Sequence, residues 1–241
     1  MLKTLIQKAI NKFGYQINKV VENSRFDDIH RQLINIISPK KVVIFDVGAH
    51  RGESVKRFRN IFPDSIIHSF EPDKDNFSDL KNKYSTDDKI YLNNFGIGNL
   101  NGKSKYYKNV KTSSSGLYKV NMNSDWIKVR SEQFNVNPDD FTERVYEVDI
   151  RTLDGYINEK SVDRIHILKL DTEGNENECL KGCINTLEHG KIDIIELEMI
   201  VGDQYEKQLS FKEIEKIILP AKYKFFGINK PGDLLDKSFL V

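Results

Sequence analysis

Residues 42–54 read VVIFDVGAHRGES. The stretch begins with β-branched and aromatic residues, which favour a strand, and then passes through Gly48 and Gly52. It continues into a helical pattern in which Val55 and Phe58 share one face. Gly48 lets the backbone turn without a Cβ clash, and Gly52 lets a ligand lie close to the main chain near the positive end of the helix. The stretch therefore predicts a strand, a tight turn and a helix that open onto a ligand.

A second strand-like run, residues 66–70, delivers Glu71 at its carboxyl end. In open α/β sheets a carboxylate at this position accepts hydrogen bonds from the hydroxyls of a ribose. Because Pro72 follows, an alternative is that Glu71 is an acidic residue at the start of a helix, where it interacts with the helix dipole. The two successive strand ends together favour a nucleotide-like cofactor.

Composition narrows the partners. The chain has 241 residues, with 37 basic and 36 acidic side chains, so no overall field attracts it to nucleic acid, and a small molecule or neutral polymer is the expected partner.

Cys179 and Cys183 share one face of a helical pattern and are expected to pack as small apolar residues rather than to form a disulfide or a zinc site. No run approaches the roughly 18 apolar residues that span a bilayer, and the N-terminus lacks a signal-peptide core, so we expect a cytoplasmic protein.

The first forty residues differ from the rest. Residues 2–13 repeat apolar side chains at helical spacing with lysines between them, which predicts an amphipathic basic helix. We expect this helix to pack against the domain, with peripheral membrane contact or acceptor binding as alternatives. A second helical pattern ends at Pro39. We therefore divide the chain into a helical extension, residues 1–40, and a domain, residues 41–241.

Strands and helices alternate after residue 40, which favours a parallel sheet covered by helices on both faces. A helical pattern spans residues 73–84, and the strand-like runs are residues 41–45, 65–70, 89–93, 164–170 and 192–197. Two regions break the alternation. Residues 104–149 are polar with scattered aromatics and predict a strand-bearing insertion over the sheet. The end of the chain, from Tyr223, predicts a hairpin that forms an antiparallel edge.

The strand ends carry mostly acidic or amide side chains, and ligands of such sheets bind beyond the carboxyl ends of the strands. These residues are Asp46, Glu71, Asn93, Asn94, Asp171, Glu173, Glu196 and Glu198. An acidic rim repels a polyphosphate. The turn also departs from the G-x-G-x-x-G spacing of dinucleotide sites, since Ala49 and His50 stand where its second glycine is expected. S-adenosyl-L-methionine, which has an adenosine, an amino acid and a sulfonium but no phosphate, fits better.

Several segments now resemble one family. Residues 46–52, 70–72, 94–102 and 152–154, and above all ILKLDTEGNE at residues 167–176, look like the FkbM family of S-adenosylmethionine-dependent methyltransferases. The resemblance spans about residues 42–198, and His50 departs from the asparagine that is usual there. It implies a Rossmann-like class I methyltransferase: an α/β fold with a mostly parallel seven-stranded sheet, an antiparallel C-terminal hairpin, and helices on both faces.

The resemblance also implies roles at the cofactor. Glu71 would hold the ribose, Asp46 would lie by the amino group of the methionine part, and Asn94 would face the adenine. Gly48 and Gly52 would let the methionine part approach the backbone. For Asp46 and Asn94 the alternative is a strand-end cap or a turn former. The implied cofactor contacts are Asp46, Gly48, Ala49, His50, Gly52, Glu71, Asn94 and Asp171.

The catalytic candidates are Asp171, Glu173 and Lys169. An alcohol is a poor nucleophile until a base takes its proton, and Asp171 leaves a central strand beside the cofactor, so it is our first choice for base or acceptor-orienting carboxylate. Glu173, like Glu176, opens a helix, where acids are also favoured by the dipole. Lys169 lies within an apolar strand and must find a carboxylate, either Asp171 or a glutamate of the next strand, which would keep that carboxylate ionised.

A metal site is the open alternative. Asp171 with Glu196 or Glu198 offers hard oxygen ligands at adjacent strand ends, as in magnesium-dependent O-methyltransferases, but the resemblance does not require a metal and we expect none. The resemblance thus implies an O-methyltransferase acting on a hydroxyl of a sugar, glycan or other polar metabolite. The alternatives are an NAD(P)-dependent oxidoreductase and a non-catalytic cofactor-binding module.

Overall fold

The computed structural model describes residues 25–200, 202–207 and 210–226. The chain divides into two compact units: residues 37–226 form one, and residues 1–36 and 227–241 form the other. In the unit of residues 1–36 and 227–241, the described residues belong to helix α2 (Arg25–Ile37). This helix confirms the prediction of a helix that ends before Pro39. The predicted helix at residues 2–13 lies outside the described residues. The division into an extension and a domain at residue 40 stays a prediction.

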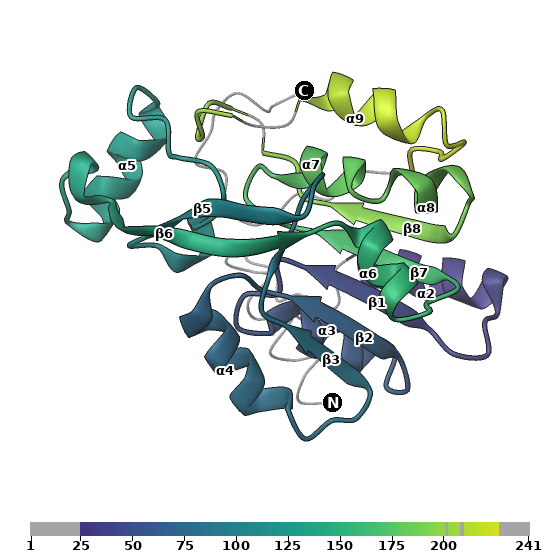
Figure 1. Cartoon of the computed structure of the whole chain (residues 1–241). Helices are drawn as coiled ribbons and strands as arrows, with labels where there is room; N and C mark the ends of the chain where they lie inside the picture. Colours follow the sequence, from purple (N-terminus) through teal and green to yellow (C-terminus); the bar gives the residue numbers. More distant parts are fainter. Residues whose placement is uncertain (1–24, 201, 208–209, 227–241) are drawn as a thin grey trace, which may run out of the picture. The chain divides into compact units, whose positions relative to one another are not determined.

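The larger unit is built on a five-stranded sheet in the order β3-β2-β1-β7-β8 (Figure 1). All its neighbouring strands are parallel, as the alternation of strands and helices predicts. The strands are β1 (Val43–Val47), β2 (Ile66–Phe70), β3 (Ile90–Asn93), β7 (Ile165–Leu170) and β8 (Ile192–Leu197). Every residue of β7 is buried, which is typical of a central strand covered on both faces.

The register of this sheet places all five strand ends in one row. Val47 pairs with Phe70 on one side and with Leu170 on the other. Phe70 in turn pairs with Asn93, and Leu170 pairs with Leu197. The residues that follow these positions therefore emerge along one edge of the sheet, where ligands of open α/β sheets bind.

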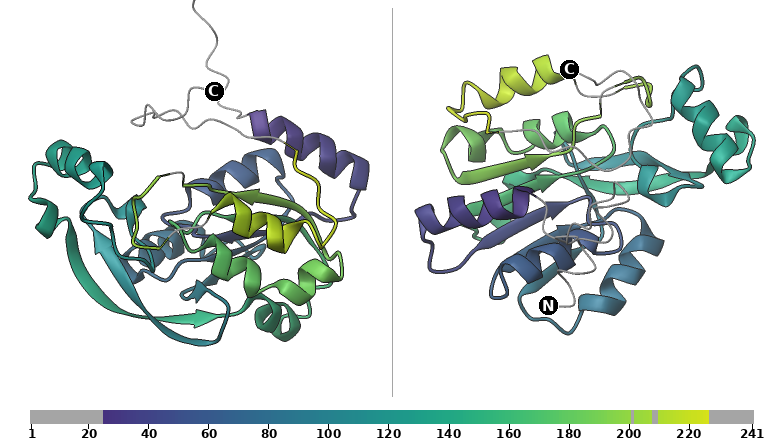
Figure 2. Two further views of the ribbon diagram at one scale, coloured as in Figure 1. Left: turned by 90° about the horizontal axis from the view of Figure 1, so that it is seen from above. Right: turned by 180° about the vertical axis from the view of Figure 1, so that it is seen from behind.

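Helices lie on both faces of this sheet (Figures 1 and 2). On α3 and α4 the buried apolar residues include Val55, Phe58 and Leu80, at helical spacing. An apolar cluster joins strand residues such as Phe45 and Leu168 with residues of α6 and α7. The helices are α3 (Glu53–Ile61), α4 (Lys74–Tyr84), α6 (Leu153–Glu159), α7 (Glu176–Lys181), α8 (Ile184–Glu188) and α9 (Phe211–Ile218). None of the described helices is long and apolar enough to cross a membrane.

A second sheet, in the order β4-β6-β5, confirms that residues 104–149 bear strands. Its strands are β4 (Gly96–Ile97), β5 (Gly102–Asn109) and β6 (Thr142–Arg151). β5 and β6 are antiparallel, whereas β4 pairs with β6 in parallel, so this sheet starts earlier in the chain than the predicted insertion. Between β5 and β6 lie the short helices η1 (Thr112–Ser114) and η2 (Pro138–Asp140) and the helix α5 (Asp125–Phe134).

The predicted C-terminal hairpin is described only at its start. Residues 223–226 form no strand, and residues 227–241 lie outside the described residues. Tyr223 instead packs against the apolar cluster of Phe45 and Leu168, and its hydroxyl donates a hydrogen bond to the carbonyl of Ile192 at 2.7 Å. The prediction that residues 223–226 form a strand is therefore wrong. This segment is held by a side-chain contact to β8 instead of by the backbone hydrogen bonds of a strand.

Candidate active site

The turn after β1 is tied to the two neighbouring strands. The Gly48 N–H donates to the carbonyl of Phe70 at 3.1 Å, and the Asp171 N–H donates to the carbonyl of Val47 at 3.1 Å. Gly48 has φ +81°, and a Cβ there would lie 1.7 Å from the carbonyl oxygen of Asp171. Only glycine fits this close approach. The predicted role of Gly48 in a sharp turn is confirmed, and the neighbour that excludes a side chain is the end of β7.

Beyond these strand ends lies a cavity of about 520 Å³. Eight of the residues singled out from the sequence line it, namely Gly48, Ala49, His50, Glu71, Lys169, Asp171, Glu173 and Glu198. Four others do not line it, namely Asp46, Gly52, Asn94 and Glu196. The register of the sheet brings the first set together because each member lies at, or just after, a strand end.

Glu71 is a buried carboxylate at the cavity wall, with 4% of its surface exposed. One of its oxygens accepts a hydrogen bond from the His50 N–H at 2.9 Å, and the other accepts one from the Asp73 N–H at 2.8 Å. Burial raises its pKa to about 8, against the effect of these hydrogen bonds. Asp73, not Glu71, caps α4 by accepting from the Asn76 N–H. The Asn76 side chain also hydrogen bonds to Glu71, so part of the acceptor capacity of this carboxyl group is used within the protein and the rest is left to a ligand.

Asp46 lies beneath the cavity rather than in its wall. It is fully buried, and its carboxylate accepts a hydrogen bond from the Ser54 hydroxyl at 2.6 Å. Its other oxygen lies 3.2 Å from Nζ of Lys169. The contacts of Asp46 are thus with the protein, and its effect on a ligand would pass through Lys169.

Asn94 and Gly52 also serve neighbouring segments. The Asn94 side-chain amide donates to the carbonyl of Glu71 at 2.9 Å, which fixes the backbone beside that carboxylate. Gly52 has φ +90°, and a Cβ there would lie 2.5 Å from Cε2 of Tyr84 and 2.9 Å from Cδ1 of Leu80. The space that the missing side chain of Gly52 leaves is taken by α4, and a role of Gly52 beside a ligand stays a prediction.

Lys169 links the two acids on either side of the turn. Its Nζ lies 3.1 Å from Oδ2 of Asp171 and donates to the carbonyl of Gly48 at 3.4 Å. The predicted pairing of Lys169 with Asp171 is therefore confirmed. Burial alone would lower the pKa of Lys169, but Asp171 and Asp46 outweigh it and raise that pKa. In return, although burial raises the pKa of Asp171, the charge of Lys169 holds it below its ordinary value.

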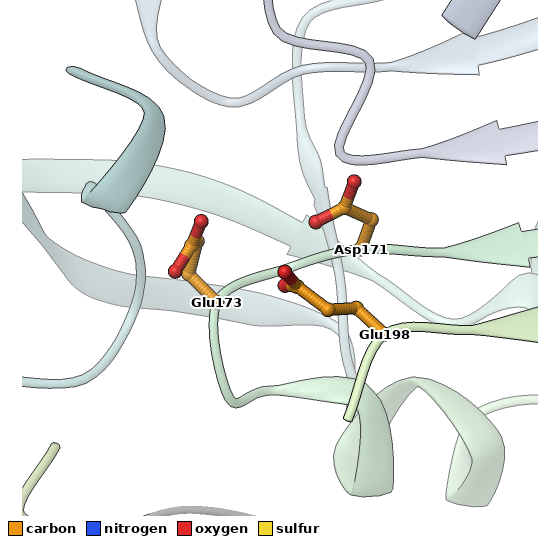
Figure 3. A group of neighbouring side chains, drawn as sticks. All are labelled: Asp171, Glu173 and Glu198. Carbon is orange, nitrogen blue, oxygen red and sulfur yellow. The ribbon is translucent and has the colours of Figure 1, made fainter. Parts of the chain in front are cut away.

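Asp171, Glu173 and Glu198 gather at the far end of the cavity (Figure 3). Each offers a carboxylate oxygen, and these atoms all lie within 4.8 Å of one another. The Tyr205 hydroxyl donates to Glu173 at 2.7 Å, yet burial still raises the pKa of Glu173 to about 8. Loss of water around its carboxyl, with the charge of Asp171, raises the pKa of Glu198 as well.

Of the two alternatives inferred from the sequence for a metal partner of Asp171, Glu198 lies beside Asp171 and Glu196 does not. Glu196 accepts two hydrogen bonds from the Arg57 guanidinium, at 2.8 and 2.7 Å, and does not join the other acids. Glu173 takes its place beside Asp171 and Glu198. Three carboxylates of this kind are hard oxygen ligands suited to a divalent cation, and they are equally able to accept hydrogen bonds from hydroxyls or amines.

The site can now be compared with known proteins. The model of the methyltransferase FkbM domain matches residues 46–225. The chain belongs to this family. It is also 24% identical over 217 residues to the 2-O-methyltransferase NoeI of Sinorhizobium fredii (strain NBRC 101917 / NGR234), a match that covers 87% of this chain and 83% of that protein.

As an FkbM family member the chain is a methyltransferase, so its reaction uses a methyl donor. The oxidoreductase and the non-catalytic module are not favoured. The resemblance on the segments from residue 46 to the acidic run at residues 167–176 is thereby confirmed. The α/β architecture with a parallel central sheet agrees with the Rossmann-like fold expected of the family.

One wall of the cavity was missed by sequence reasoning. It comes from β5 and the turn after it, and consists of Tyr106, Lys111, Thr112, Ser113, Ser115, Gly116 and Leu117. Thr112 Oγ1 lies 3.1 Å from Nε2 of His50. A Cβ on Gly116 would lie 3.3 Å from Cβ of Glu173, so the turn rests on the acidic loop. The cluster of serines at residues 113–115 is a visible signal in the sequence, but only the fold shows that it reaches the strand ends.

Proposed function

We propose that this FkbM family protein transfers the methyl group of S-adenosyl-L-methionine to a hydroxyl of a sugar, glycan or other polar metabolite. The observation that carries the proposal is Glu71, a buried carboxylate in the cavity wall, at the end of the second strand of a parallel sheet. A ribose with its two hydroxyls is the ligand that such a carboxylate binds in open α/β folds.

The cavity is divided in a way that suits this donor. Near Glu71 it is lined by apolar groups of Phe70, Pro72 and Ile97, which suit an adenine ring. Toward β7 it is lined by carboxylates, which suit a sulfonium and an ammonium group. S-adenosyl-L-methionine supplies a methyl group already activated by its positive sulfur. The protein has to hold that group and bring an acceptor oxygen to about 3 Å from it, in line with the bond that breaks.

Asp171 is the proposed base or orienting group for the acceptor. It follows β7, lines the cavity, and is kept ionised by Lys169, so it can accept the hydroxyl proton as the oxygen–carbon bond forms and the carbon–sulfur bond breaks. Glu173 is the second candidate, because a pKa of about 8 suits a base near neutral pH. Lys169 does not need to touch the acceptor, since its role is to hold the charge of Asp171.

An oxygen acceptor is supported by the comparison with a protein named as a 2-O-methyltransferase. A polyhydroxylated acceptor is supported by the hydroxyls of Thr112, Ser113 and Ser115 and by the carboxylates beyond them, because both kinds of group bind sugar hydroxyls well. We propose that no metal is needed, and that Asp171, Glu173 and Glu198 act on the ligands directly.

Calorimetry with S-adenosylhomocysteine tests the donor site. We expect Glu71→Ala and Gly48→Val each to abolish binding, and Asp171→Ala to retain binding while turnover is lost. Glu143→Ala, which removes an exposed carboxylate from β6 outside the cavity, is the control and should bind as the wild type does. Circular dichroism checks that each variant is folded. Undiminished affinity in folded Glu71→Ala protein would overturn the assignment of the donor site.

Transfer of a labelled methyl group to candidate saccharides tests the acceptor class. We expect label in a base-stable ether of the sugar, and none with the matching deoxy sugar. Transfer only to an amine or a carboxylate would contradict a hydroxyl acceptor while leaving the donor site intact. Titration with NADH, followed by fluorescence, tests the oxidoreductase alternative separately.

A further inference from the structure

Lys111 is a basic residue in the cavity wall that forms no direct ion pair within the described part of the chain. It precedes η1, is half-buried, and lines the cavity. Among the described residues its ammonium group has no hydrogen bond or salt bridge, whereas Lys169, the other lysine of the wall, lies between two carboxylates. A half-buried cation that faces a cavity without a carboxylate in direct contact is suited to bind an anionic group of a ligand.

The position of Lys111 along the cavity follows from its neighbour. Thr112 contacts the His50 ring at 3.1 Å, so the turn of Lys111 is docked on the turn that follows β1. The charge of Lys111 also acts on Glu173, where it opposes the rise in pKa that burial causes. Lys111 thus lies near the β1 turn and the loop after β7.

The charges of the cavity wall indicate which anionic group could bind beside Lys111. Five acidic residues line the cavity, namely Glu53, Glu71, Asp171, Glu173 and Glu198. An acceptor with its own negative charge would have to lie beside Asp171, which is ionised and would repel it. The amino-acid end of the methyl donor has a different pattern, since it carries an ammonium group beside its carboxylate. The acids can bind the ammonium group while the carboxylate requires a cation.

We propose that Lys111 binds the α-carboxylate of the methionine part of the donor. This inference rests on the proposed function, and it makes the turn after β5 a part of the donor site. The insertion would then close the cavity over the cofactor, in addition to any contact that it makes with the acceptor. Ribose and methionine would be held from different sheets, by Glu71 and Lys111 respectively.

A pair of ligands separates this role from a general effect on the cavity. S-adenosylhomocysteine has the carboxylate, and its decarboxylated analogue keeps the amine and the adenosine but lacks that one group. We expect Lys111→Gln to weaken binding of S-adenosylhomocysteine about ten- to a hundred-fold, which is the range for a hydrogen bond to a charged group. Binding of the decarboxylated analogue should stay within about two-fold of the wild type, because it has no partner for Lys111.

Two further variants complete the experiment. Lys111→Arg keeps the charge and should recover most of the affinity for S-adenosylhomocysteine. Lys105→Gln removes an exposed lysine of β5 that does not line the cavity, and it should bind both ligands as the wild type does. Calorimetry at one fixed ionic strength measures all four proteins.

Three results would overturn the inference. Equal loss of both ligands in Lys111→Gln would show that the residue shapes the cavity instead of binding the carboxylate. Unchanged binding of both ligands, with a raised KM for the acceptor, would assign Lys111 to the acceptor. Wild-type protein that binds neither ligand would overturn the proposed function together with this inference, whereas the first two results leave the proposed function standing.

Discussion

Lys169 and Asp171 stand two residues apart at the end of β7, and their charged atoms lie 3.1 Å from each other. Successive side chains of a strand alternate between the two faces of the sheet, so residues two apart point the same way. The pair therefore follows from the K-x-D spacing of the sequence. Asp46 approaches the same ammonium group from β1, where it is paired in register with Lys169.

The first prediction concerns this ammonium group. Lys169→Met keeps the length of the side chain and removes its charge, which leaves the fully buried Asp46 without its cation. We expect the free energy of unfolding at pH 7 to fall by about 3–5 kcal/mol, the usual cost of breaking a buried ion pair. Urea unfolding measures this. The double variant Lys169→Met/Asp46→Asn should recover part of the loss, and a single variant as stable as the wild type would contradict the role given to the pair.

The same variant should change the pH dependence of turnover. Lys169 holds the pKa of Asp171 below its ordinary value, so in the wild type Asp171 loses its charge only as the pH falls below that ordinary range. Without Lys169, burial raises the pKa of Asp171 unopposed by that charge. We expect the acidic limb of the kcat profile to move to higher pH. A limb that stays in place would argue against Asp171 as the base.

A second prediction follows from Glu71, whose pKa burial raises to about 8 in the free protein. Ribose hydroxyls donate to the ionised carboxylate, so the proton must leave before they bind. We expect the affinity for S-adenosylhomocysteine to increase as the pH rises from 6 to 8 and to level off above that value. Calorimetry in two buffers of different ionisation enthalpy should also detect proton release at pH 7. Glu71→Gln should weaken binding and flatten the profile, and an equally steep profile in that variant would point to another group.

The ionisation of Glu71 should also affect the free energy of unfolding. As the pH rises, this free energy should fall, whereas the affinity for the ligand should increase. Between its ordinary value of 4.5 and about 8, folded Glu71 holds a proton that the unfolded chain has released. The stabilisation that protonated Glu71 gives to the folded protein is therefore complete below the ordinary pKa, and it is lost as the pH rises through about 8. We expect the ligand-free wild type to lose more stability between pH 6 and pH 9 than Glu71→Gln does, as measured by urea unfolding.

The third prediction compares two glycines with positive φ. An alanine at Gly52 would adopt φ +90° and place its Cβ 2.5 Å from the ring of Tyr84, whereas one at Gly190, with φ +62°, would meet no atom within 4 Å. We expect Gly190→Ala to cost about 1 kcal/mol from backbone strain alone. Gly52→Ala should cost about 2–4 kcal/mol, because overpacking adds to the strain. Equal losses of stability in Gly52→Ala and Gly190→Ala, measured by thermal unfolding, would show that α4 moves to admit the new Cβ at no energetic cost.

The fourth prediction concerns metal removal. The charge of Asp171 is already matched by Lys169, and Glu173 is already hydrogen-bonded to Tyr205. We therefore expect dialysis against EDTA to leave kcat and KM unchanged. Loss of turnover that Mg²⁺ restores, and that Glu198→Gln abolishes, would instead assign these three acids to a cation.

Much of the fold could be predicted from the sequence because its central strands are continuous apolar runs. β7 is buried along its whole length, and its predicted range, residues 164–170, differs from the observed one by a single residue. The second sheet was harder to predict. β5 reads GKSKYYKN, and most of its polar residues lie outside the core, so neither its start nor its pairing with β6 shows in the pattern. α5 was not predicted either, because its apolar residues are too few to mark one face clearly.

The candidate site was predictable where it depends on strand ends. Glu71 and Asp171 directly follow buried strands, and they line the cavity. The partner of Glu196 could not be predicted in the same way. Glu196 is the last but one residue of β8, so the face of the sheet on which its side chain lies determines which residue it contacts. It pairs in register with Lys169 but is bound by Arg57 of α3. Lys111 could not be predicted, since its place depends on contacts between segments far apart in sequence, such as Thr112 with His50.

The missing side chain of Gly48 has a consequence for ligand exchange. With the carbonyl of Asp171 filling that space, and with hydrogen bonds crossing from the β1 turn to Phe70 and from Asp171 to Val47, three strand ends form one rigid floor. The floor has no hinge at which the acids and the turn could part. With the floor fixed, we expect any adjustment of the cavity to a substrate or product to come from the opposite wall, the turn after β5.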